Sequence, residues 1–384
     1  PPHPPTPPPP PPTPPPPPGG GGYNGIVYYK IGDFMRRIRR KKEKQKKKII
    51  IISTFLFLII MTSGYAAFST NITLRAKGNI KERPQDESCF TYYDNGDGTL
   101  TVSGYDVEKC GTDVNIPEKI NGLSVTKIGS GAWQTNKGFS KLGLTSVVIP
   151  DTVTTIGVFA FYGNNISKLK LGDGVKKIGG EAFNHNDLTE LVLPDGLEYL
   201  DNEAFAQNKL THAELPKSLT YMGGGVFNRN NFPEDNPIVY GVDANGNTDY
   251  TVLDSYARNE LNNYVIPSTV KTIAHRAFRG VRINGLTIPS NVETLNSQAF
   301  NSAVINSIMI EDGLKNIISS DSYGGGTFKE TVFNCELTLP STVEYIDVNT
   351  FNGSNIKTIN IKKGEGSIIG EPWGASRAKV NWLG

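Results

Sequence analysis

The sequence predicts a β-rich solenoid with turns of about 22 residues and a parallel sheet, preceded by one transmembrane helix. Three observations predict this architecture. A segment that ends in Phe recurs at a spacing of 22 within residues 114–361, residues 49–68 are uncharged, and residues 36–48 include ten Lys or Arg. Three cysteines among 384 residues exclude a disulfide-dense scaffold, so the stability of the chain has to come from packing.

Residues 1–34 form a Pro- and Gly-rich segment, and 15 of the 26 prolines fall within residues 1–18. Such a composition cannot bury a core. We expect a disordered extension or, because Met35 stands directly before the basic block, a mis-called stretch upstream of the native start. If the tract is translated, it is a polyproline II spacer or a ligand for a proline-binding module.

The next two segments predict membrane anchoring. Residues 35–48 are expected to be a basic cytoplasmic tail, and residues 49–68 a transmembrane signal anchor that exports the rest of the chain across the plasma membrane. Twenty residues of helix rise ~30 Å, which matches the hydrocarbon core of a bilayer. The densest apolar part spans only 49–61, so the alternative is a cleaved signal peptide and a secreted protein.

The charge of the folded region argues against a nucleic-acid partner. From residue 49 onward the chain has 28 Lys or Arg and 35 Asp or Glu, a net charge of −7. The basic block abuts an apolar stretch, which is typical of a topology signal that also contacts anionic lipid. We therefore predict association with a membrane and no binding of nucleic acid.

After a linker at 69–88, residues 89–117 are expected to form an N-terminal cap hairpin. Two stretches with alternating apolar residues surround the turn sequence at 95–98, which is typical of a β-hairpin. Such a hairpin would cover the open edge of the first turn of a solenoid. Cys89 and Cys110 flank it, and in an exported domain they either form a disulfide or remain reduced. Cys335 has no obvious partner and is expected to be a buried small residue.

The solenoid is predicted over residues 114–361. One copy holds too few apolar side chains to bury a core alone, whereas stacked copies place equivalent residues ~4.8 Å apart, the spacing of neighbouring strands. An early copy closes with Trp133 in place of Phe. The predicted structural ladder of stacked rings consists of Phe161, Phe183, Phe205, Phe227, Phe278, Phe300, Phe328 and Phe351.

An insertion at 228–262 interrupts the repeats. It contains a predicted hairpin with Asn245-Gly246 at its tip, which we expect to project from the solenoid. This hairpin either carries specificity or covers the side of the solenoid. Residues 362–384 are expected to form the C-terminal cap.

The repeated unit L-x-x-L-x-L-P-x-x-L-x-x-I-x-x-x-A-F resembles the BspA-like class of leucine-rich repeats. Its Ala-Phe pair recurs, for example at 160–161, 182–183 and 204–205. The copies lack the Asn or Cys ladder that follows the strand in the general leucine-rich pattern. The resemblance implies a solenoid with caps, displayed by a bacterial surface protein that binds host or bacterial surface components.

The sequence contains no pattern typical of a catalytic centre. The glycine clusters at 223–225 and 324–326 lack the Lys and Ser or Thr of a phosphate-binding loop. His185, His212 and His275 belong to different copies and are expected on the surface. We therefore predict no enzyme, no cofactor and no catalytic or metal-binding residue.

The predicted function depends on the outward side chains of the strands, which vary while the inward columns stay apolar. These side chains form the candidate binding face for an extracellular protein or glycan, which makes adhesion the predicted role. The alternatives are a surface hydrolase with its site in 228–262, and a structural spacer without a specific ligand. The candidate binding face comprises Lys168, Lys170, Glu190, Val192, His212, Glu214, Thr287 and Met309.

Overall fold

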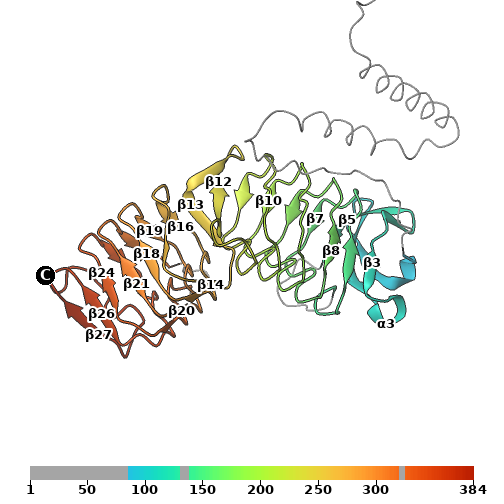
Figure 1. Ribbon diagram of the computed structural model, residues 1–384. Helices are drawn as coiled ribbons and strands as arrows, with labels where there is room; N and C mark the ends of the chain where they lie inside the picture. The colour runs from blue at the N-terminus through green and yellow to red at the C-terminus, as the bar shows by residue number, and fades with distance from the viewer. Residues whose placement is uncertain (1–84, 130–137, 320–324) are drawn as a thin grey trace, which may run out of the picture. The chain divides into compact units, whose positions relative to one another are not determined.

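A computed structural model describes residues 85–129, 138–319 and 325–384, all of which belong to one compact unit, Ile80–Gly384. This unit is a β-solenoid built from short parallel strands, which confirms the predicted fold class (Figure 1). The predicted cytoplasmic tail and transmembrane anchor lie outside the described residues. Within the described part of the chain, no helix is long and apolar enough to span a bilayer.

The first half of the solenoid has two ladders of strands. The longer ladder begins with an antiparallel hairpin and continues as parallel strands. Its members are β1 (Phe90–Asp94), β2 (Thr99–Tyr105), β5 (Leu123–Ile128), β7 (Thr155–Ile156), β9 (Lys177–Ile178), β10 (Tyr199–Leu200) and β11 (Tyr221–Met222), with β4 (Lys119–Ile120) paired to β5. The shorter ladder consists of β3 (Asp113–Asn115), β6 (Ser146–Val148) and β8 (Lys168–Lys170).

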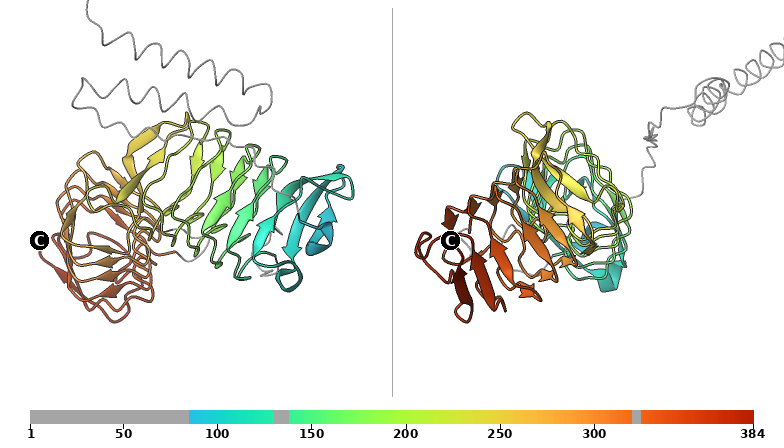
Figure 2. Two further views of the ribbon diagram at one scale, coloured as in Figure 1. Left: turned by 45° about the vertical axis from the view of Figure 1, so that its right-hand side comes forward. Right: turned by 60° about the vertical axis from the view of Figure 1, so that its left-hand side comes forward.

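The second half has three ladders, followed by a closing sheet, and all their strand pairs are parallel except the antiparallel pair of β12 and β13. The first ladder is β12 (Ile238–Val242), β13 (Thr248–Tyr256), β16 (Thr272–Ile273), β19 (Thr294–Leu295), β22 (Asn316–Ile317) and β25 (Tyr345–Ile346). The second is β14 (Glu260–Leu261), β17 (Arg282–Ile283), β20 (Val304–Ile305) and β23 (Val332–Phe333), and the third is β15 (Tyr264–Val265), β18 (Leu286–Ile288) and β21 (Ile308–Ile310). The closing sheet is β24 (Leu337–Leu339), β26 (Thr358–Ile361) and β27 (Lys379–Trp382). Figure 2 shows these short strands lying side by side in successive turns.

The spacing of 22 residues sets the register of the ladders. Ile156 pairs with Ile178, Ile178 with Leu200, and Leu200 with Met222. Proline follows several strands, as at Pro150, and prevents further ladder bonds because it has no N–H. The repeat pattern predicts strands at 190–192 and 212–214 too, but the chain forms none there, so the ladder that contains β8 ends at that strand.

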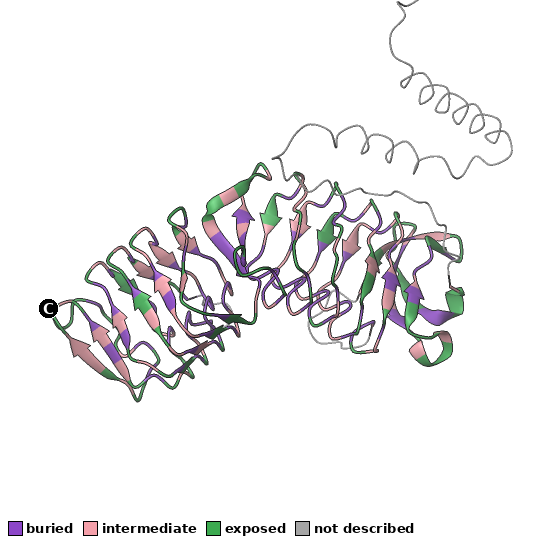
Figure 3. Ribbon diagram, in the orientation of Figure 1, coloured by how far each residue is buried: buried purple, intermediate pink, exposed green. Residues whose placement is uncertain are grey.

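Aromatic rings form two buried columns along the solenoid axis. All eight Phe side chains of the predicted ladder are fully buried. Figure 3 shows that buried positions recur along successive turns of the solenoid. Neighbouring rings are nearly parallel; the Phe183 and Phe205 centroids, for example, lie 5.3 Å apart. Phe139 begins the first column and packs 5.0 Å from Phe161, whereas Trp133 lies outside the described residues. Tyr256 begins the second column, 5.3 Å from Phe278.

The insertion is part of the wall and does not project from it. Strands β12 and β13 form the predicted hairpin, and the turn between them contains Asn245-Gly246. Val252 and Leu253 of β13 pair in parallel with β16, so this end of the hairpin is the first parallel strand of the second-half ladder. The expectation of a projecting hairpin is therefore wrong.

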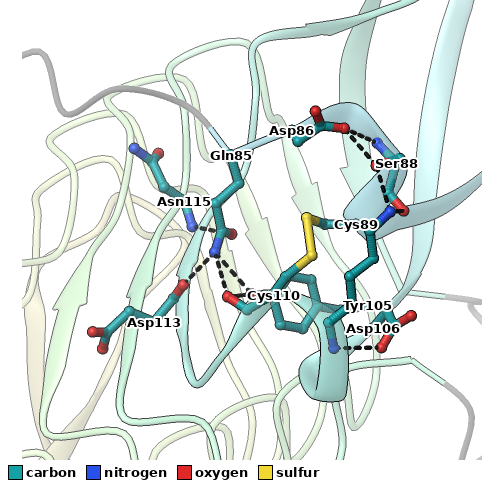
Figure 4. The surroundings of a disulfide bond; sticks show 10 residues. Gln85, Asp86, Ser88, Cys89, Tyr105, Asp106, Cys110, Asp113 and Asn115 are labelled. Atoms are coloured by element: carbon teal, nitrogen blue, oxygen red, sulfur yellow. Dashed lines mark hydrogen bonds between the residues drawn. A yellow bond between two sulfur atoms is a disulfide. The ribbon is translucent and has the colours of Figure 1, made fainter.

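The N-terminal cap is closed by a disulfide between Cys89 and Cys110 (Figure 4). The side chain of Gln85 points toward the same corner, where its amide nitrogen donates to the carbonyl oxygens of Cys110 and Asp113. At the other end of the solenoid, the side chain of Trp373 is fully buried beneath the closing sheet. Both ends of the described region thus cover their last turns with additional structure.

Candidate ligand-binding surfaces

The structure brings three residues of the predicted binding face together. Lys168 and Lys170 lie exposed on the outward face of β8, and Glu190 lies on the turn that follows. These three side chains line a hollow of about 430 Å³. The remaining lining residues are Ser146, Val147, Val148, Ser167, Leu169 and Thr189.

This hollow occurs where the ladder of β3, β6 and β8 ends. The strand β8 pairs with β6 on one side, while the chain at 190–192 runs past its other side without forming a strand. The outward face of β8 and the first residues of the following turn are therefore accessible together. We call this region, defined by β6, β8 and residues 189–190, the lysine face.

The polar groups around the lysine face have a defined charge pattern. Asp113 accepts hydrogen bonds from the hydroxyls of Ser146 (2.7 Å) and Thr145 (2.9 Å). These bonds, together with nearby Lys168, lower the pKa of the Asp113 carboxyl, so this group is anionic at neutral pH. The two lysines provide positive charge between Asp113 at one edge and Glu190 at the other. Such a pattern is complementary to a ligand that offers acidic groups to the lysines and hydrogen-bond donors to the two carboxylates.

The other residues of the predicted binding face lie elsewhere. Val192, His212 and Glu214 are exposed on the two turns after the lysine face, outside any strand. Thr287 and Met309 belong to another sheet, in which Val265 pairs with Thr287 and Thr287 pairs with Met309. Met309 is 55% exposed and Val265 is 58% exposed, so this row presents apolar side chains to solvent. The eight predicted residues thus lie on two separate surfaces.

A buried asparagine ladder is the main feature that the sequence reasoning missed. Asn164, Asn186, Asn208 and Asn230 follow the phenylalanines by three residues and are buried. The Asn186 amide nitrogen donates to the carbonyl oxygens of Phe161 (3.0 Å) and Phe183 (3.1 Å), and its oxygen accepts from the backbone N–H of Ile166 (3.1 Å). This ladder follows Phe, so it is distinct from the Asn or Cys ladder after the strand that the copies lack. Its position after Phe, and not after the strand, concealed it, although its spacing of 22 was visible.

A partly buried ion-pair network connects the two halves across the insertion. Glu203, only 3% exposed, accepts from Arg276 at 2.7 Å and also contacts Arg279. The side chain of Glu181 lies 3.6 Å from Arg276, and burial and nearby Glu203 raise the pKa of Glu181. The two arginines that share the Glu203 carboxylate thus lie more than 70 positions after it in the chain.

Histidine positions differ from the expectation at one site. His185 and His212 are exposed, as expected, whereas His275 is half-buried at the junction of the two halves. There it lines a cavity together with Asp254 of the insertion. Burial and Arg276 lower the pKa of His275 to about 4, so the ring is neutral at pH 7. The repeat spacing could not predict this environment, because it depends on how the hairpin enters the wall.

Among residues 85–129, 138–319 and 325–384, no group of three His, Cys, Asp or Glu side chains is arranged to hold a metal ion. Cys335 is half-buried, and burial raises the pKa of its thiol.

Known proteins resemble this chain in sequence and fold. A family model described as a BspA type leucine rich repeat region matches residues 134–234 and 253–371 in six copies. A leucine-rich cell surface protein of Faecalibacterium prausnitzii is 18% identical with a TM-score of 0.40, covering 79% of this chain and 96% of its own. A leucine-rich repeat protein of Eubacterium ventriosum is 21% identical with a TM-score of 0.45, covering 71% and 85%. The pneumococcal vaccine antigen PcpA is 21% identical with a TM-score of 0.43, covering 71% and 80%. No curated protein matches the chain.

Proposed function

Since the chain belongs to the BspA-type leucine-rich repeat family, we propose that it is a surface-displayed binding protein that holds an extracellular protein or glycan through its lysine face. Solenoids of this kind present long, solvent-facing surfaces on a rigid scaffold, which is typical of binding proteins and not of enzymes. In this proposal the repeat domain lies outside the cell, and residues 49–68 anchor it in the plasma membrane.

One observation carries the proposal. The lysine face combines two exposed lysines, an exposed carboxylate and an open hollow of about 430 Å³ on a wall fixed by the ladder of β3, β6 and β8. Rigid backbone beneath exposed charged side chains lowers the entropic cost of binding. A flat, open hollow of this type fits one side of a macromolecule better than an enclosed small molecule.

The binding test uses the compact unit Ile80–Gly384 against arrays of matrix proteins, glycans and bacterial cells. Saturable retention supports a binding protein, turnover of an arrayed substrate supports the hydrolase, and neither result supports the spacer. The charge-swap variant Lys168→Glu/Lys170→Glu should weaken retention at least tenfold, because two favourable charges become repulsive.

A matched control separates this surface from a general charge effect. Lys127→Glu/Lys177→Glu changes the charge by the same amount on exposed residues of the other ladder of the same half. This control should bind like the parent protein. Equal losses in both variants would contradict the assignment to the lysine face.

Anchoring is tested separately, by fractionating producing cells and shaving them with protease. The proposal expects the repeat domain in the membrane fraction and accessible from outside. Recovery of the intact domain in the culture medium would favour cleavage of the signal.

A further inference from the structure

A second cavity, of about 370 Å³, lies where the insertion interrupts the ladder of the first half. The ladder ends at β11, and the next ladder begins at β12; no strand pair joins the two. The cavity is lined by Tyr221 of β11, Gly241 of β12, Val252 and Asp254 of β13, and His275. It is separate from the lysine face, since the two share no lining residue.

One wall of this cavity is an aromatic platform. Tyr199 and Tyr221 are in register on β10 and β11, and their rings stack with centroids 4.2 Å apart and planes 5° apart. Tyr221 is the last residue of this stack and is 44% exposed. Gly241 of β12 also lines the cavity and contributes no side chain to it.

The deeper part of the cavity carries an acidic group without a cationic neighbour in the lining. The side chain of Asp254 is buried and accepts a hydrogen bond from the Ser255 hydroxyl at 2.6 Å. No Lys or Arg is among the lining residues of this cavity. The adjacent Arg276 instead pairs with Glu203 and donates to Gln298 at 3.0 Å. His275 is neutral at pH 7 because its pKa is lowered to about 4.

We propose that this cavity binds a primary ammonium group on a slender stem, such as that of a lysine side chain or an amino sugar, with Asp254 as its counter-ion. The ammonium would lie between the Asp254 carboxylate and the free face of the Tyr221 ring, which attracts cations through its π electrons. The stem would contact the apolar side chains of Met222, Val242 and Val252. This site is independent of the proposed function, because it uses a different wall of the solenoid.

The proposal has a pH signature. Burial raises the pKa of Asp254 to about 7, whereas its Ser255 hydrogen bond opposes that rise. An ammonium binds the ionised carboxylate, so affinity should increase about tenfold between pH 6 and pH 8 for a group with this pKa. The other titratable side chains at the cavity are His275, already neutral in this range, and Tyr221.

The experiment titrates the protein with Nα-acetyl-lysine methylamide and follows binding by NMR or calorimetry. The matched neutral probe carries a second acetyl group on the side-chain nitrogen and should bind at least tenfold more weakly. Glucosamine against N-acetylglucosamine then tells whether a sugar body is accepted in place of the lysine stem. Equal affinity for both members of each pair, or no saturation by ~50 mM, would overturn the proposal.

Two variants locate the site. Asp254→Asn should lower the affinity for the lysine probe at least tenfold and remove its pH dependence. Tyr221→Leu removes a half-exposed ring but keeps an apolar side chain against Tyr199, and it should lower the affinity about threefold. Tyr345→Leu alters another exposed tyrosine, on β25 of the second-half ladder, and should bind like the parent. If Asp254→Asn does not fold, an unchanged affinity of Tyr221→Leu would by itself overturn the site.

Discussion

The two halves of the solenoid form hydrogen bonds between neighbouring turns by different means in the segment that follows each Phe of the column. In the first half, the residue three positions after each column Phe from Phe161 to Phe227 is a buried Asn whose amide bridges backbone groups of neighbouring turns. In the second half, the equivalent positions hold Val281, Ala303 and Thr331, and the following residues form the ladder of β14, β17, β20 and β23. A side-chain ladder in one half thus takes the place of a backbone ladder in the other.

The Phe column is common to both halves, whereas the segment that follows Phe differs, so the column is the constant element of the repeat. Both halves stack their rings at spacings of about 5 Å, for example 5.1 Å between Phe161 and Phe183 and 5.2 Å between Phe278 and Phe300. In the second half, where strands form a backbone ladder after Phe, the asparagine ladder lies on the surface. There Asn306 donates to Asn284 at 2.6 Å, and Asn284 donates to Asn262 at 2.7 Å.

The largest expected effect comes from removing a buried asparagine. Asn186→Ala would leave the Ile166 N–H without its side-chain acceptor. Phe161 O and Phe183 O would each lose one of two amide donors and keep the bond from Asn164 or Asn208. A buried unpaired polar group costs about 1–3 kcal/mol and each lost hydrogen bond about 0.5–1.5 kcal/mol, so we expect a loss of about 3–4 kcal/mol in the free energy of unfolding, measured with urea. A loss below about 1 kcal/mol would mean that these backbone groups do not depend on the ladder.

The connection between the halves is tested by Glu203→Gln. This change leaves Arg276 and Arg279 without the carboxylate that they share across the insertion. We expect a loss of about 2–3 kcal/mol, because breaking a buried ion pair leaves charge uncompensated. The control is Glu198→Gln, which breaks an exposed pair with Lys176 and should leave the free energy of unfolding close to that of the parent, because water screens this pair. Equal effects of both variants would show that the network does not stabilise the junction.

The junction also carries a pH-dependent contribution. Burial raises the pKa of Asp254 to about 7, above the ~3.9 of an unfolded Asp, so the folded state holds this proton more tightly. Stability from this group is therefore lost as pH rises from ~4 to ~7. Relative to the parent, Asp254→Asn should gain about 2 kcal/mol between pH 5 and pH 7.

Denaturation in urea at both pH values measures that gain. Asp113→Asn serves as the control, because the pKa of Asp113 is lowered and the group titrates below this range in both states. The difference between Asp113→Asn and the parent should stay constant between pH 5 and pH 7. The same constancy for Asp254→Asn would contradict a raised pKa at the junction.

The smallest effect is expected at the surface asparagine ladder of the second half. Asn284→Ala removes hydrogen bonds with Asn262 and Asn306, but water can replace them because these side chains are partly exposed. We expect a loss of about 0.5–1 kcal/mol, measured by thermal denaturation. A loss as large as that of Asn186→Ala would remove the distinction between the two ladders.

The sequence predicted the fold class because the spacing of 22 places equivalent side chains above one another, and few other folds tolerate that repetition. It could not predict which turns form strands, since Leu-x-Leu occurs at both 169–171 and 191–193, but only the first of these segments contributes to a paired strand, β8. Asn186 resembled an ordinary turn residue until its backbone partners were known. The environment of His275 depends on contacts with an insertion outside the repeat, for which no periodicity exists.

Neighbouring turns are joined through rungs of only two or three residues in most ladders, and this has a mechanical consequence. Tension applied between the ends of the described region would peel turns away one after another, each releasing about 22 residues, or roughly 70–80 Å of extended chain. The N-terminal cap would not extend in this way, because the chain between Cys89 and Cys110 cannot be stretched while their disulfide is intact. Extension would therefore proceed in steps of nearly equal length, with the cap retaining its size throughout.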